Sequence, residues 1–151
     1  MHLEDETATI SLGAAIAGCV VRGLTIFLNG ELGAGKTTLV RGLITGLGYE
    51  GKVKSPTYNL VELYVISGLY LYHFDFYRFG DSRELRDAGL AEYFNGDNVC
   101  LVEWPERAQA DLPQPDLRIA LEIDEAGGRN ARVSSETGAG HRCIAALKLR
   151  L

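Results

Sequence analysis

The chain has 151 residues, of which 46% are hydrophobic and 23% charged, a balance typical of one soluble globular domain with its own core. Its formal net charge of −5 argues against strong binding to nucleic acid by this chain alone, which needs a basic face, but a partner could still hold the nucleic acid. No apolar run approaches the roughly 20 residues that span a bilayer, and the acidic start MHLEDETAT is unlike a secretory or mitochondrial signal, so we expect a cytoplasmic protein without membrane contact.

The first half of the chain predicts helices and strands in alternation. A helix is expected over residues 8–21, with Thr7 or Asp5 as its cap. A buried strand (24–29), a glycine-rich loop and a second helix (37–48) follow, and Gly48 is suited to end that helix.

The middle of the chain begins with a segment that turns from loop into strand, residues 49–64. An aromatic, alternating strand is expected over residues 68–79. A capping box at residues 81–84 then predicts a helix over 84–94, and a buried strand ending in an acid is expected over 98–104.

The last third predicts mainly strands. A turn with two prolines (112–116) leads to strands over 117–124 and 142–149, separated by a hairpin or mobile region. Helices alternating with strands, followed by strands alone, predict an α/β fold with a mixed central sheet and flanking helices. We expect a single P-loop NTPase domain over residues 1–151.

The spacing of the three cysteines indicates no metal site and no catalytic role. Cys19, Cys100 and Cys143 are scattered without metal-binding spacing. An odd, unpaired set predicts a reducing compartment, with each thiol a small core residue.

The segment NGELGAGKTTLVRGL (29–43) contains the pattern G-x-x-x-x-G-K-T, formed by Gly30, Gly35, Lys36 and Thr37. The glycines let backbone N–H groups converge on phosphate oxygens, at the positive N-terminal end of the following helix. Lys36 can reach the β- and γ-phosphates, and the Thr37 hydroxyl can bind Mg²⁺. The alternative is a glycine-rich turn that binds nothing, but the flanking strand and helix are the context that this motif requires.

A phosphate loop also needs an acid to hold Mg²⁺, and two predicted strands end in one, at Asp75 and at Glu103. Spacing alone does not rank them, and either could be a solvated strand-end carboxylate. The SPT turn (55–57) is equally compatible with a plain β-turn and with a segment that senses the γ-phosphate. His73 lies two residues before Asp75, and we expect a hydrogen-bonded strand histidine there rather than a catalyst.

Several segments occur together in a fixed order: T-x-x-LG (9–13), GELGAGKTTLVRGL, VKSPTYNLVE, YHFDFYR and LVEWPE. Together they resemble the TsaE-type P-loop ATPases of bacterial tRNA threonylcarbamoyladenosine biosynthesis, over roughly residues 9–106 and more loosely beyond. The P-loop alone is unspecific, whereas the SPT, HxDxYR and VEWPE segments make the resemblance specific.

The resemblance implies a small cytoplasmic ATPase with ATP and Mg²⁺ as its ligands. Its expected partners are a threonylcarbamoyl-transferase subunit and the paralogous scaffold subunit, which modify adenosine 37 of tRNA, so that tRNA would be met only indirectly. By this resemblance Lys36 would hold the phosphates, Thr37 and Glu103 would hold Mg²⁺, and Asp75 would orient or activate water. The implied nucleotide-binding set is Thr9, Gly33, Ala34, Gly35, Lys36, Thr37, Thr38, Trp104 and Arg129. Of these, Arg129 lies in the C-terminal part of the chain, where the resemblance is weaker.

Three competing functions are less well supported. A small GTPase would need an N-K-x-D type guanine reader, which the sequence lacks, so we expect ATP to be preferred over GTP. A small-molecule kinase would need a substrate lid, for which the chain has no room. A non-enzymatic module that uses ATP only as structural glue would not need both Asp75 and Glu103.

Overall fold

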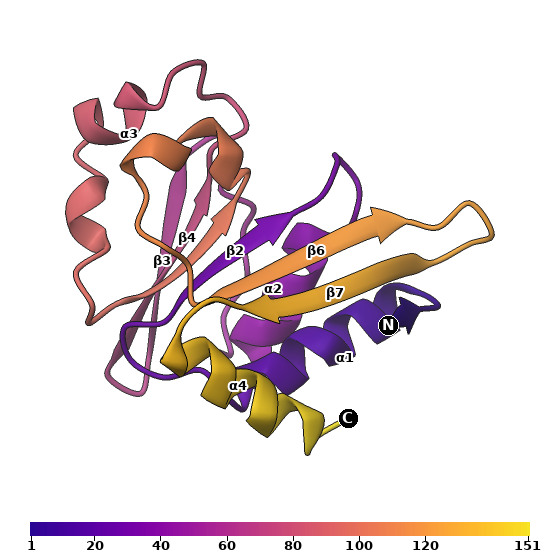
Figure 1. The fold of residues 1–151 in the computed structure, drawn as a ribbon. Helices are drawn as coiled ribbons and strands as arrows, with labels where there is room; N and C mark the ends of the chain where they lie inside the picture. The colour runs from indigo at the N-terminus through magenta and orange to yellow at the C-terminus, as the bar shows by residue number, and fades with distance from the viewer.

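The computed structural model describes residues 1–151 as one seven-stranded sheet with helices packed against it (Figure 1). The order of strands across the sheet is β1-β7-β6-β2-β5-β4-β3. The strands are β1 (His2–Leu3), β2 (Thr25–Asn29), β3 (Val61–Ile66), β4 (Leu69–Asp75), β5 (Val99–Glu103), β6 (Leu117–Ile123) and β7 (Arg129–Ser135). The four central strands β6, β2, β5 and β4 run parallel, while β1, β7 and β3 pair antiparallel at the margins, so the predicted α/β class with a mixed sheet is confirmed.

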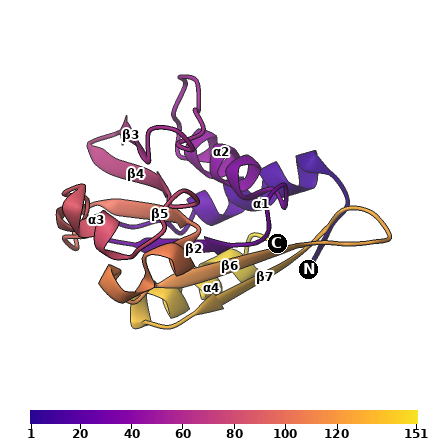
Figure 2. The same ribbon diagram turned by 90° about the horizontal axis from the view of Figure 1, so that it is seen from above.

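The helices are α1 (Glu6–Ala17), α2 (Lys36–Gly46), α3 (Arg83–Asp87) and α4 (Gly138–Lys148), with three short 3₁₀ turns at Ala91–Tyr93, Pro105–Arg107 and Gln109–Asp111. Seen from above, α1 and α2 lie side by side along the sheet (Figure 2). None of the helices combines the length and apolar character needed to span a bilayer.

The alternation of side chains along the central strands separates two apolar layers. On one face Ile26 and Leu28 of β2 pack in the larger core together with residues of α1, α2 and α4. On the other face Phe27 packs with Phe74 and Val102, under the segment that holds α3 and the 3₁₀ turns. Because β4 and β5 are in register, their last residues, Asp75 and Glu103, lie opposite each other on the face of α1 and α2.

The prediction of a strand over 142–149 is wrong, because this segment belongs to the helix α4. Thr137 caps that helix by accepting a hydrogen bond from the Gly140 N–H at 3.1 Å, and its own hydroxyl donates to Asp116 at 2.6 Å. The buried residues Cys143 and Leu147 are four positions apart and enter the larger core on one side of the helix. A short apolar run is compatible with the period of a helix and with that of a strand. In this segment the packing of one side against the core favours the helix.

One smaller expectation also needs correction. The helix expected over 84–94 ends at Asp87, because Gly89 follows in the left-handed conformation (φ 71°) and only a 3₁₀ turn comes after it. The region after residue 124, for which a hairpin or a mobile segment was expected, forms a hairpin, because β7 pairs antiparallel with β6 along its whole length.

The expectation of unpaired cysteines is wrong for two of the three. Cys19, just after α1, and Cys143 of α4 form a disulfide across 124 positions of sequence, with their Cα atoms 4.9 Å apart. The packing of α4 beside α1 brings them together, which sequence spacing could not indicate. Cys100 is a buried free thiol, and burial raises its pKa to about 12.

Candidate functional site

Glycines shape the loop between β2 and α2. Gly33 and Gly35 have φ values of 82° and 103°, a left-handed conformation that residues with a side chain rarely adopt. Gly35 is also the N-cap of α2, and no side chain caps that helix end. A Cβ atom at Gly33 would meet nothing within 4 Å, so the space beside this residue is open.

The main-chain donors of this loop lack protein partners. No backbone hydrogen bond is made by the N–H groups of Gly33, Gly35, Lys36, Thr37 and Thr38. Folded proteins rarely leave so many adjacent donors unpaired, and at a helix N-terminus such donors form an anion site. The loop therefore fits a chain of phosphate groups.

Two basic side chains hold the carbonyl groups of the same loop. The Lys36 Nζ donates to Glu31 O at 3.1 Å and also to Gly30 O. From the start of β7, Arg129 donates through Nη2 to Gly33 O at 3.0 Å and through Nε to Ala34 O at 3.1 Å. With its carbonyl oxygens bound to these cations, the loop can present its N–H groups to an anion.

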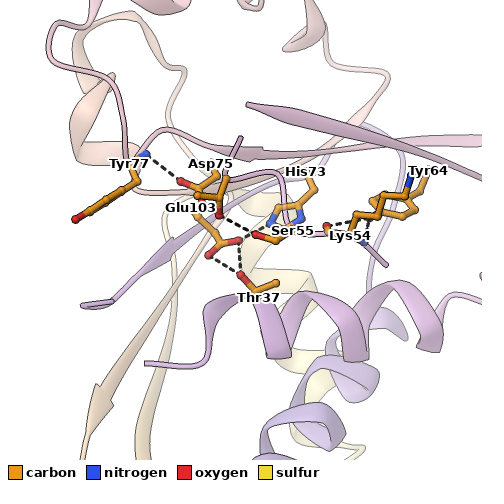
Figure 3. Close-up of polar contacts among 9 residues, drawn as sticks. Thr37, Lys54, Ser55, Tyr64, His73, Asp75, Tyr77 and Glu103 are labelled. Carbon is orange, nitrogen blue, oxygen red and sulfur yellow. Dashed lines mark hydrogen bonds and ion pairs between the residues drawn. The ribbon is translucent and has the colours of Figure 1, made fainter. Parts of the chain in front are cut away.

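A buried polar chain begins at the first turn of α2 (Figure 3). The Thr37 hydroxyl lies 3.1 and 3.2 Å from the two carboxylate oxygens of Glu103, at the end of β5. The same carboxylate lies 2.6 Å, through Oε2, from Nε2 of His73 on β4. His73 is fully buried and Glu103 is 3% exposed, so water contributes little to this chain.

Asp75 ends β4 beside Glu103 and is held by two donors (Figure 3). The Tyr77 N–H donates to Oδ1 at 2.9 Å, and the Thr57 hydroxyl donates to Oδ2 at 3.3 Å. Burial raises the pKa of Asp75 above its ordinary value, and the nearby Glu103 carboxylate adds to the shift, while the two hydrogen bonds oppose it. The SPT turn thus reaches the site through Thr57.

Trp104 covers the lysine of the loop. Its backbone is in the left-handed conformation (φ 58°, ψ 49°), uncommon for a residue with a side chain, and turns the chain sharply after β5. The Lys36 Nζ lies 4.1 Å from the centroid of its ring, within the range of a cation–π contact. Burial lowers the pKa of Lys36, although the carboxylates of Glu103 and Asp75 oppose the shift.

Two cavities flank the loop and bring together all the residues predicted for the site. The inner cavity, of about 230 Å³, is lined by residues that include Ala34, Lys36, Thr37, Thr57, Asp75, Glu103 and Trp104. The outer cavity, of about 290 Å³, is lined by residues that include Glu4, Asp5, Glu6, Thr9, Gly128 and Arg129. Gly33, Gly35 and Thr38 line both, so the two spaces are neighbours across the loop.

The metal-binding capacity of the site is small without a ligand. No group of three or more His, Cys, Asp or Glu side chains could hold a metal ion. The Thr37 hydroxyl and the Glu103 carboxylate converge from α2 and β5, and both are oxygen ligands suited to Mg²⁺. The pair fits Mg²⁺ that arrives with a nucleotide, whose phosphate oxygens would supply further ligands.

Sequence reasoning placed His73 on the strand but did not connect it with Glu103. Its Nε2 is paired, as expected of a strand histidine, but its buried Nδ1 has no hydrogen-bond partner. The signal available was the spacing of His73 two residues before Asp75. Finding the contact also required the register of β4 on β5, which the sequence does not show.

Comparison with known proteins gives consistent results. The model of the family described as "Threonylcarbamoyl adenosine biosynthesis protein TsaE" matches residues 3–132. The chain is 42% identical to the tRNA threonylcarbamoyladenosine biosynthesis protein TsaE of Haemophilus influenzae, covering 96% of this chain and 94% of that protein. It is 41% identical to the TsaE protein of Bacillus subtilis, covering 92% and 83%. The crystal structure of Bacillus subtilis YdiB superposes with a TM-score of 0.82 at 30% identity, covering 97% of this chain and 90% of that one.

Proposed function

Because the chain belongs to the TsaE family of tRNA threonylcarbamoyladenosine biosynthesis proteins, we propose that it is a P-loop ATPase that serves this modification. It binds and hydrolyses ATP with Mg²⁺, and the hydrolysis drives the cycle of a threonylcarbamoyl-transferring partner complex. Alone it is a weak ATPase, and its turnover is coupled to its partners.

One observation carries the proposal: the loop residues whose N–H groups are unpaired line a cavity that is also lined by two strand-end acids. A loop that only bound phosphate would need the N–H groups and Lys36, but not Asp75 and Glu103 side by side. A hydrolytic site needs one acid for the metal and one group for the attacking water. Glu103, in contact with Thr37, suits the first role, and Asp75 suits the second.

Each residue has a distinct task in this proposal. The loop N–H groups and Lys36 bind the phosphates, while Thr37 and Glu103 hold the metal. When bound, Mg²⁺ would neutralise negative charge that develops on the phosphate oxygens. Arg129 keeps the loop carbonyls turned away from the ligand, and Thr9, in the outer cavity, lies where the nucleoside part would extend.

Asp75 is suited to orient water for attack. The Tyr77 N–H and the Thr57 hydroxyl fix its carboxylate in the inner cavity. Its raised pKa makes it a better proton acceptor than an ordinary exposed aspartate would be. General-base assistance of this kind contributes about 10²- to 10⁴-fold to a rate.

The partners in this proposal are the threonylcarbamoyl-transferase subunit and its paralogous scaffold subunit, in the cytoplasm. The net charge of −5 agrees with contact to tRNA only through them, because a tRNA-binding face needs clustered positive charge.

The test is the release of inorganic phosphate from ATP by the purified chain, with and without the partner complex and with and without Mg²⁺. We expect slow, Mg²⁺-dependent release that rises when the partners are added. ATP binding without phosphate release under every condition would contradict the proposal and would favour a module that uses ATP as structural glue.

A further inference from the structure

His73 lies in the second layer of the site, behind the acid that contacts α2. Its Nε2 is 2.6 Å from Glu103 Oε2, and the whole ring is buried. The ring does not line the cavity itself. Its contact with the site therefore runs through Glu103.

The unpartnered nitrogen of the ring indicates where the proton lies. Nδ1 is buried and has no hydrogen-bond partner. A buried N–H without an acceptor is costly, whereas an imidazole nitrogen without a proton leaves only a lone pair unpaired. The ring therefore carries its proton on Nε2 and donates it to the Glu103 carboxylate.

Glu103 needs such a donor because of its neighbours. It lies beside the Asp75 carboxylate in the β4–β5 register, and the two acids repel each other when both are ionised. Its other donor in the protein, the Thr37 hydroxyl, is also a candidate metal ligand. If the Thr37 hydroxyl binds a metal, His73 is the donor that still fixes the Glu103 carboxylate.

We propose that His73 is a positioning residue for the metal site. By binding Oε2, it fixes the rotamer of Glu103 and leaves Oε1, which lies 3.2 Å from the Thr37 hydroxyl, open to the metal. The inference rests on the proposed Mg²⁺–nucleotide function. Hydrogen-bond partners of a metal ligand are commonly worth about 10- to 100-fold in metal affinity.

The test compares two substitutions of equal length. His73→Gln keeps an N–H donor near the position of Nε2, whereas His73→Met fills similar volume without a donor. Each variant, with wild type, is titrated with Mg²⁺ in the presence of ADP, and the fluorescence of Trp104, the only tryptophan, reports binding. ADP affinity in EDTA and the melting temperature are measured in parallel.

We expect His73→Met to need about 10- to 100-fold more Mg²⁺ for half-maximal response, with its ADP affinity in EDTA unchanged. His73→Gln should recover most of the wild-type Mg²⁺ dependence. Equal Mg²⁺ dependence in all three proteins, or an equal loss in the two variants, would overturn the positioning role. A wild-type protein without any Mg²⁺-dependent nucleotide binding would instead refute the proposed function.

A measurement on the unaltered protein covers the case in which His73→Met does not fold. Nitrogen NMR of histidine-labelled protein distinguishes a ring protonated at Nε2 from one protonated at Nδ1. We expect the Nε2 form, with its signal shifted when Mg²⁺ and ADP are added together. A proton on Nδ1 would overturn the inference.

Discussion

The two sides of the phosphate loop are built differently. On the inner side, side chains from β4, β5 and α2 contact one another directly, and His73, Asp75 and Glu103 are all buried. On the outer side, Arg129 binds the loop through main-chain carbonyls, and the neighbouring residues Glu4 to Glu6 are exposed. The inner side therefore depends on residue identity for its chemistry, and the outer side mainly supports the shape of the loop.

The largest effect should come from Lys36→Ala on the inner side. Removing the charge that faces the phosphates should lower ATP turnover by about 10³-fold or more, with folding preserved. Phosphate release and circular dichroism check the two parts. Lys148→Ala, an exposed lysine of α4, is the control. An unfolded Lys36→Ala protein, or one with wild-type turnover, would mean that the loop is structural.

The next effect separates the two inner acids. Asp75→Ala should bind ATP nearly normally but lose about 10²- to 10⁴-fold in turnover, because a group that acts mainly in the transition state lowers the rate and spares binding. Glu103→Ala should lose Mg²⁺-dependent binding and hydrolysis together. Nucleotide binding with and without Mg²⁺, measured beside single-turnover hydrolysis, checks both variants. The opposite pattern would exchange the two roles.

A smaller effect is expected on the outer side. Arg129→Gln removes the paired donation to Gly33 O and Ala34 O, so the loop should bind nucleotide about 10-fold more weakly, while bound ATP is hydrolysed at nearly the wild-type rate. Arg129→Lys should recover only part of this loss, since lysine lacks the forked donors of arginine. Calorimetric titration with ADP measures the affinity. A fall in single-turnover rate without a fall in affinity would place Arg129 with the inner residues.

The smallest effect concerns stability and pH. Because burial raises the pKa of Asp75, its contribution to stability is fully present below the unfolded pKa and is lost as the pH rises through the folded pKa. Asp75→Asn should therefore raise the melting temperature at neutral pH by about 1–3 °C, and the gain should vanish toward about pH 4.

Asp81→Asn is the matched control for this pH dependence. Its hydrogen bonds with Arg83 lower the pKa of that exposed carboxyl, so the substitution should not stabilise the protein at neutral pH. A gain for Asp75→Asn that persists unchanged in acid would show that the ionised form of Asp75 is not its source.

The contrast between the inner and outer sides of the loop also explains which parts of the site the sequence could predict. Asp75 and Glu103 each end a strand with a clear pattern, and parallel strands that flank a phosphate loop bring their ends to it, so the inner side was largely predictable. The partner of His73 was not, because it depends on strand register. The contact of Arg129 with Ala34 joins positions 95 apart and was not predicted, since family resemblance implied only that Arg129 belongs to the nucleotide-binding set. Helix α4 was mistaken for a strand because its period is ambiguous in eight residues.

The bond between Cys19 and Cys143 changes the topology of the polypeptide. It closes residues 19–143 into a covalent ring that contains every residue of the inner side, while Thr9 lies on the tail that leaves the ring. A protease cut at one loop within the ring would open it without releasing a fragment. Such a nicked protein would run as one piece in electrophoresis without reductant and as two pieces after reduction. A pull applied to the two termini would likewise pass through the sulfur atoms and bypass the phosphate loop.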